Sequence, residues 1–167
     1  MEPINYHLVG DKMKNNIVVK PIDMVWQDPQ SFCITEFIRD ELFYYFKCWD
    51  YQSMLDGEIK DADFLGCFNV ENILAVKHIR FTKSETYPID FENNLKCYYY
   101  EVNDSLWLDD VLKERKTNDE DWRKYDTNNY RHFVLENEKY WIEVIGSNLI
   151  FEKKEKDKNR MELWEDF

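Results

Sequence analysis

Glycine and proline are scarce in this chain, and positive charge is in deficit. Each of the two residue types occurs four times in 167 residues. This scarcity excludes collagen-like repeats and glycine-rich phosphate loops, and none of the common nucleotide-binding or hydrolase motifs occurs. Lysine and arginine number 22 against 34 acids, which gives a net charge of −12. Because phosphate contacts need a basic surface, this balance argues against nucleic acid as a partner.

Long apolar runs are also missing. The longest, such as residues 42–46, cover only a few positions, whereas a transmembrane helix needs about 20. The first residues contain no basic stretch followed by an apolar one, so no signal peptide is predicted. We therefore expect a cytoplasmic protein with no membrane contact.

Metal and redox chemistry have few candidate residues. The three histidines are scattered, and no C-x-x-C pair links the four cysteines, which are Cys33, Cys48, Cys67 and Cys97. We expect reduced, buried thiols, no metal site and no cofactor. The acidic stretch over residues 56–63 lacks the glycine position and the closing glutamate of a calcium loop, so we interpret it as a solvated loop.

Aromatic residues are abundant instead, at 17 % of the chain. Disordered chains lack aromatics, so this composition predicts a folded protein. The length corresponds to one domain. We predict a single domain over residues 1–152, followed by a charged C-terminal extension at 153–167 that docks through its last residues.

Residues 29–49 have the spacing of a long helix. Asp28 and Pro29 form a typical helix start, and apolar residues then recur every three or four positions. On this helix Phe43 and Tyr44 fall on the outward side. A strand over residues 31–38 is the alternative, because that segment is rich in β-branched and aromatic residues.

Other segments read mainly as strands. Residues 4–9 and 16–20 predict an N-terminal hairpin, and residues 73–81 and 97–102 predict two further strands. Ser105 is placed to cap a helix of about ten residues whose buried face consists of Trp107, Leu108, Val111 and Leu112. The predicted fold is an α+β domain, with a mostly antiparallel sheet of about five to seven strands and two main helices packed on one face.

A hairpin is expected over residues 130–145, with a two-residue turn at Asn137 and Glu138. Pairing Glu136 with Lys139 puts an apolar set on the core face, namely Phe133, Leu135, Tyr140, Ile142 and Val144. The opposite face then carries His132, Trp141 and Glu143, which fit either a structural cross-strand pair or an acid–base site. Residues 149–152 predict a third strand that completes an antiparallel meander.

The charge pattern favours a protein partner. Residues 61–120 contain 13 acids and 7 bases, which is half of the net negative charge. Acids around exposed aromatic anchors suit a basic protein partner, since charge steers association and aromatic contacts slow dissociation. The candidate partner-binding residues are Phe43, Tyr44, Asp109, Asp110, Trp122, His132, Trp141 and Glu143.

The segments at residues 99–107 and 131–145 carry a resemblance. A strand that runs into Asp104-Ser105-Leu106-Trp107, followed by a hairpin beginning Arg131-His132, resembles small bacterial proteins among the polymorphic-toxin immunity proteins. The resemblance covers about residues 76–152. It implies a cytoplasmic, acidic, non-enzymatic α+β domain that binds a cognate toxin and blocks its activity. Many such toxins are nucleases with basic surfaces.

Two other functions stay open. One is a small enzyme that uses His132 and Glu143, or a cysteine. The other is a structural or regulatory subunit of an assembly, and the sequence leaves the oligomeric state open.

Overall fold

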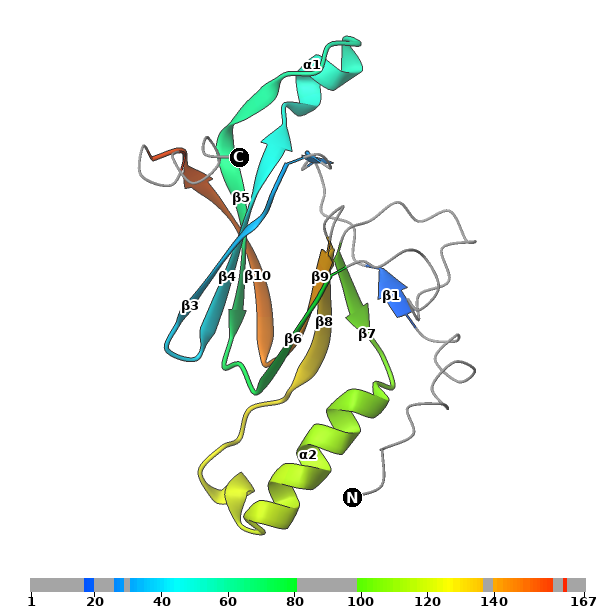
Figure 1. Cartoon of the computed structure of the whole chain (residues 1–167), viewed down its shortest axis with the longest axis vertical. Coiled ribbons are helices and arrows are strands. Elements are labelled where there is room, and N and C mark those ends of the chain that lie inside the picture. The colour runs from blue at the N-terminus through cyan, green and yellow to red at the C-terminus, as the bar shows by residue number, and fades with distance from the viewer. Residues whose placement is uncertain are drawn as a thin grey trace.

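The chain forms mostly antiparallel β-strands. The computed structural model describes residues 17–19, 26–28, 31–80, 99–136, 140–157 and 161. Within these residues there are two α-helices and two five-stranded sheets (Figure 1). The elements are β1 (Ile17–Val19), β2 (Trp26–Gln27), β3 (Ile34–Ile38), β4 (Glu41–Trp49), α1 (Tyr51–Leu55), β5 (Asp61–Glu71), β6 (Ala75–Arg80), β7 (Tyr99–Val102), α2 (Leu106–Asn118), the 3₁₀ turn η2 (Trp122–Lys124), β8 (Arg131–Glu136), β9 (Tyr140–Gly146) and β10 (Asn148–Glu155).

The α+β prediction is right as a class, but the strands are divided between two sheets. The first sheet has the order β1-β7-β8-β9-β6, and the second has the order β10-β5-β4-β2, with β3 also paired to β4. The predicted strand at 16–20 contains β1, and those at 73–81 and 97–102 contain β6 and β7. Residues 4–9 lie outside the described residues, so the N-terminal hairpin stays a prediction.

The long helix predicted over residues 29–49 is wrong. Strands β3 and β4 form an antiparallel hairpin there, with Phe37 paired to Leu42 and a turn at Arg39 in the left-handed region (φ 59°). The alternative of a strand over 31–38 is confirmed for β3. Alternate residues of β4, including Tyr44 and Phe46, enter the main core, while Phe43 packs on the opposite face of the sheet.

The main core lies between the two sheets and contains many of the aromatic side chains. Rings from both sheets meet there, with Phe46 5.3 Å and Phe68 4.2 Å from the Tyr99 centroid. Phe151 of β10 also lies 5.6 Å from Phe68. Gly66 leaves room for this cluster, because a Cβ atom there would lie 2.3 Å from the Phe46 ring. Burial of these rings accounts for much of the aromatic surplus.

The hairpin over residues 130–145 is confirmed as β8 and β9, but its register is shifted. Glu136 pairs with Trp141 rather than with Lys139. The turn residues 137–139 lie outside the described residues. A shift by two residues keeps every side chain on its predicted face, because strand side chains alternate with a period of two. Four of the residues predicted to face the core are accordingly buried there, Phe133, Leu135, Ile142 and Val144, while the Tyr140 side chain lies outside the described part of the structure.

The predicted three-stranded meander is wrong, because β10 leaves the sheet that contains β9. The chain crosses from the first sheet to the second at Gly146 and Ser147, and β10 pairs with β5. A matching crossover joins β5 of the second sheet to β6 of the first sheet. Hydrogen bonds hold the two crossovers together, from Ser147 N to Glu71 O (2.8 Å) and from Leu74 N to Ile145 O (2.7 Å). The two sheets therefore share a corner.

Helix α2 begins where the sequence predicted. The Ser105 side chain caps it by accepting a hydrogen bond from Leu108 N at 3.1 Å. The predicted apolar face, which includes Trp107 and Val111, packs with Ile145 of β9 and with Trp122. Since Ile145 pairs with His132, α2 lies on the face of the first sheet that points away from the second sheet.

The structure also bears on the predictions made for the cysteines and for the domain boundary. Cys33, Cys48 and Cys67 are buried, as predicted, and burial raises the pKa of the Cys48 thiol to about 12. Cys97 lies outside the described residues. The domain boundary predicted at residue 152 falls inside β10, which reaches Glu155, and Met161 of the extension packs beside Tyr45 of the second sheet.

Candidate functional site

The predicted pair of His132 and Glu143 exists, but it lies inside the molecule. In the observed register the two residues are diagonal neighbours on β8 and β9, with His132 Nε2 3.4 Å from Glu143 Oε2. The other ring nitrogen, Nδ1, lies 2.8 Å from Ser105 Oγ. Lys77 of β6 binds the same Glu143 oxygen at 3.2 Å. Serine, histidine and carboxylate thus lie next to one another across the first sheet, and we call them the Ser105–His132–Glu143 chain, in which His132 is hydrogen-bonded to Ser105 while its Nε2 atom makes no hydrogen bond to Glu143.

Trp107 of α2 covers this chain. Its ring meets the His132 ring edge to face at 5.0 Å, and Lys77 Nζ lies 3.7 Å from the Trp107 ring centroid. His132 is only 5 % exposed and Ser105 6 %. The sheet face that carries His132 and Glu143 is therefore closed to solvent at His132.

The residue types match those of nucleophilic hydrolases, but the geometry serves a different purpose. The Ser105 hydroxyl already caps α2, and buried polar groups that bond one another fix the position of the elements that carry them. The two depressions described below are lined by other residues. The Ser105–His132 hydrogen bond therefore ties the start of α2 to the first sheet.

The predicted aromatic anchors are not gathered on one surface. Tyr44 is fully buried, and its hydroxyl donates to the Glu136 carbonyl at 3.2 Å, so its predicted exposure is wrong. Phe43 is half-buried and stacks on Tyr45 at 6.4 Å. Trp122 is 4 % exposed, which corrects the expectation of partial burial. Trp141 lies in β9, but its side chain is outside the described part of the structure.

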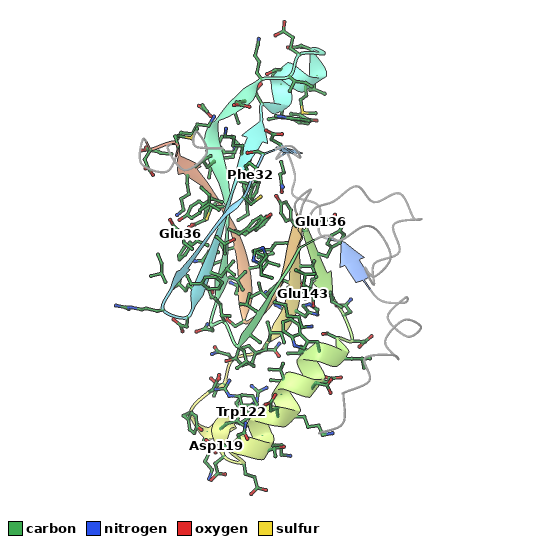
Figure 2. The ribbon with its side chains drawn as sticks, in the orientation of Figure 1. Phe32, Glu36, Asp119, Trp122, Glu136 and Glu143 are labelled. Carbon is green, nitrogen blue, oxygen red and sulfur yellow. The ribbon has the colours of Figure 1, made fainter. Side chains whose placement is uncertain are left out.

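Asp109 and Asp110 are exposed on α2, as the sequence predicted. Glu143 and Trp122 lie at separate places along the molecule, and Glu136 lies beyond Glu143 on the side away from α2 (Figure 2). The predicted site residues whose side chains are described therefore divide between the main core, the outer face of the second sheet, the underside of α2 and its solvent-facing side. They do not form one site.

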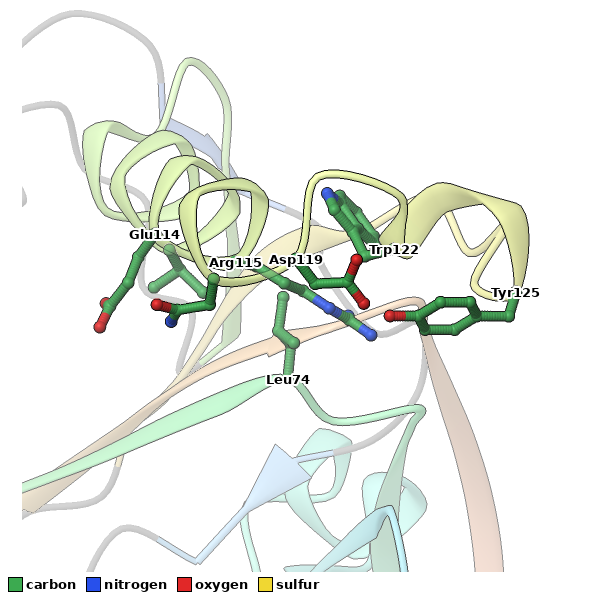
Figure 3. Close-up of a pocket in the computed structure, with 8 residues that line it drawn as sticks. Leu74, Glu114, Arg115, Asp119, Trp122 and Tyr125 are labelled. Atoms are coloured by element: carbon green, nitrogen blue, oxygen red, sulfur yellow. The ribbon is translucent and has the colours of Figure 1, made fainter.

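A depression of about 440 Å³ lies beside Trp122, where α2 meets η2 (Figure 3). Its lining residues are Leu74, Val111, Glu114, Arg115, Asn118, Asp119, Trp122 and Tyr125. A second depression, of about 390 Å³, borders the same tryptophan and is lined by Leu112, Lys113, Lys116, Glu120, Trp122 and Arg123. Tyr125 is 68 % exposed, so an aromatic ring remains available at the first depression.

Arg115 in the first depression is held by neighbouring polar groups. Its guanidinium lies 2.6 Å from Asp126 and donates to the Tyr130 hydroxyl at 3.2 Å. The pKa of the Asp126 carboxyl is lowered. Burial alone would raise it, but the hydrogen bonds from Tyr130 and Asn128 and the positive charge of Arg115 have the larger combined effect. Asp126 thus neutralises the Arg115 charge. The two other charged residues that line the depression, Glu114 and Asp119, are both acidic, so the depression has a net negative charge.

One exposed feature goes beyond the solvated acidic loop that the sequence predicts over residues 56–63. We name it the α1 tip and define it as residues 50–63. In the structure Asp50 caps α1 by accepting a hydrogen bond from Ser53 N at 2.8 Å, and the chain returns with Asp50 N bonded to Lys60 O at 2.7 Å. Figure 1 shows α1 at the opposite end of the molecule from α2.

Apolar and acidic side chains are exposed together on the α1 tip. Leu55 is 64 % exposed and Ile59 70 %, while Tyr51 lies one helical turn before Leu55. The tip has five acids and one base, and Lys60 pairs with Glu58. Leucine and isoleucine among acids were visible in the sequence, but only the returning chain shows that they are left outside the core.

Comparisons with family models, with curated proteins and with solved structures find no significant match. In the described part of the chain, no helix has the length and apolar character needed to cross a membrane. Nor do His, Cys, Asp or Glu side chains gather there in threes as a metal site would require.

Proposed function

We propose that this chain is an acidic, cytoplasmic binding protein that neutralises a basic protein partner, and that the partner is a bacterial toxin domain. The observation that carries the proposal is the α1 tip, where exposed apolar residues lie among carboxylates. Monomeric proteins commonly expose single apolar residues, but several within one acidic projection are typical of an interaction surface.

The tip supplies both contributions that such binding needs. The exposed carboxylates of Asp56, Asp61 and Asp63 attract a basic surface and raise the rate of association. Leu55 and Ile59 then lose their water against the partner, which slows dissociation. The chain inhibits by covering the partner's active site, so it needs no chemistry of its own.

The internal position of the Ser105–His132–Glu143 chain also supports a binding role over catalysis. A small enzyme at His132 would need a path for substrate past Trp107. The third possibility, a subunit of an assembly, stays a prediction that light scattering can test.

Co-expression with the product of the neighbouring gene, followed by calorimetry, tests the proposal. We expect a complex with a Kd well below micromolar. Replacing both Leu55 and Ile59 with alanine should weaken it by about tenfold or more, because anchoring residues contribute more than 1 kcal/mol each.

The matched control replaces Phe37 and Ile38 with alanine. These residues are similarly exposed, at 58 % and 53 %, but they lie at the end of β3, beside the β3–β4 turn. This variant should bind like the original chain. Equal loss in both variants would contradict the role of the α1 tip, and a Kd weaker than about micromolar would remove the inhibitor proposal.

A further inference from the structure

We propose that the first depression beside Trp122 is a binding site for an arginine or lysine side chain presented by a basic protein. The proposal rests on the proposed function only in taking the ligand to be part of a protein. It concerns a surface beside α2, at the other end of the molecule from the α1 tip (Figure 1).

The shape and lining of the depression suit a long side chain with a cationic end. Leu74 and Val111, both half-buried, provide apolar contacts of the kind that the methylene groups of arginine and lysine make. Tyr125 presents an exposed ring, and a cation over an aromatic face is attracted by the negative charge of that face. These two contacts favour a guanidinium or ammonium group on an aliphatic stem.

The charges in the depression select a cation over an anion. Arg115 is the only base among the lining residues, and Asp126 balances it at 2.6 Å. Glu114 is exposed and Asp119 is half-buried, so both can meet an entering cation. Figure 3 shows Asp119, Arg115 and Tyr125 together at one side of the depression, with Leu74 beneath them.

The second depression provides an internal contrast. It borders the same Trp122 but is lined by three bases and one acid, Glu120. One guanidinium there, that of Arg123, lies 4.0 Å from the Trp122 ring centroid. A basic side chain is therefore repelled on one side of Trp122 and attracted on the other, which would orient the partner.

A titration that needs no natural partner tests this site. The probe is the blocked tripeptide acetyl-Gly-Arg-Gly-amide, and its neutral control contains citrulline in place of arginine. Two-dimensional amide NMR should show saturable shifts at residues around the depression, including Val111, Asn118 and Tyr125. Binding in the millimolar range is expected, with the citrulline peptide at least about fivefold weaker.

Variants separate the two depressions. Glu114→Gln combined with Asp119→Asn should weaken arginine binding about tenfold, because two charge-assisted contacts are lost. The matched control, Glu120→Gln in the second depression, should change binding less than twofold.

Equal binding of the citrulline peptide would overturn the proposal, as would the absence of saturable shifts at the depression. Shifts confined to the α1 tip would also overturn it, while leaving the proposed function intact. Conversely, shifts at the depression in a chain that fails to inhibit any partner would remove the proposed function and keep this site.

Discussion

Glu136 ends β8 in surroundings that change its acidity. Burial raises the pKa of its carboxyl to about 7, and a hydrogen bond from the Tyr100 hydroxyl at 3.4 Å lowers it only in part. Its backbone carbonyl accepts hydrogen bonds from Tyr44 and from Gln27 of the other sheet. The carboxyl therefore lies close to a link between the two sheets.

Stability should fall as pH rises through this pKa. The unfolded carboxyl has a pKa near 4.5, so folding favours the protonated form, and that contribution is complete only below about pH 4.5. Between pH 5 and 8 the side chain should cost about 1–2 kcal/mol, a figure reduced for its partial exposure. Glu136→Gln should remove this part of the pH dependence and stabilise the protein at pH 8.

Urea unfolding at pH 5, 6, 7 and 8 measures this effect. Glu120→Gln, which changes an exposed acid, should leave the pH dependence as it is in the original chain. If the unfolding midpoints of Glu136→Gln and the original chain stay parallel over this range, Glu136 does not titrate there.

At the scale of elements, the paired crossovers depend on a close approach at Gly146. A Cβ atom there would lie 2.5 Å from Val70 Cγ1 and 2.9 Å from the carbonyl oxygen of Glu71. We expect Gly146→Ala to lower the free energy of unfolding by about 1–3 kcal/mol, because the backbone of Glu71 cannot move without disturbing the ladder.

A double-mutant cycle by urea denaturation identifies the cause. In a Val70→Ala background the nearest clash disappears, so the cost of Gly146→Ala should shrink. Gly57→Ala provides a comparison, because nothing lies within 4 Å there and only the left-handed backbone (φ 80°) opposes alanine. An unchanged cost of Gly146→Ala in both backgrounds would show that Val70 is not responsible.

Elements are predicted correctly from the sequence where the pattern that defines them lies within a single helix or strand. The Ser105 cap and the apolar face of α2 lie within one helix, and the faces of β8 and β9 follow from simple alternation. It failed at β4 because both faces of this strand meet apolar neighbours, the main core on one side and the cluster around Tyr45 on the other. Alternation is then lost, and apolar residues at spacings of three and four resemble a helix.

The sequence predicted which residues of the candidate site share a face, but it did not predict which of them are buried or exposed. His132 and Glu143 were rightly placed on one face, but their burial depends on Trp107, which reaches them from α2. The α1 tip was missed because exposure of Leu55 and Ile59 is set by how the chain returns at Lys60. Contacts between residues distant in sequence carry no local pattern that could reveal them.

At the scale of the whole molecule, the net charge of −12 opposes the compact state through self-repulsion. Salt screens this repulsion, since the distance over which charges interact falls from about 10 Å at 0.1 M to about 3 Å at 1 M. We expect the Tm to rise by roughly 2–5 °C between about 20 and 500 mM NaCl. Differential scanning calorimetry provides the measurement.

Potassium chloride serves as the control, because screening depends on ionic strength and not on the cation. A fall in Tm with salt would mean that ion pairs such as Arg115–Asp126 outweigh the general repulsion.

The shared corner has a consequence for the order in which the protein is made. The last described strands, β9 and β10, belong to different sheets, and they pair with β8 and β6 and with β5. A ribosome therefore releases β4 to β8 before either sheet can be completed: the β6 edge stays unpaired until β9 has emerged to residue 146, and the β5 edge until β10 has emerged to residue 155. Such edges invite pairing with other chains, so the nascent protein depends on rapid completion or on chaperone shielding during synthesis.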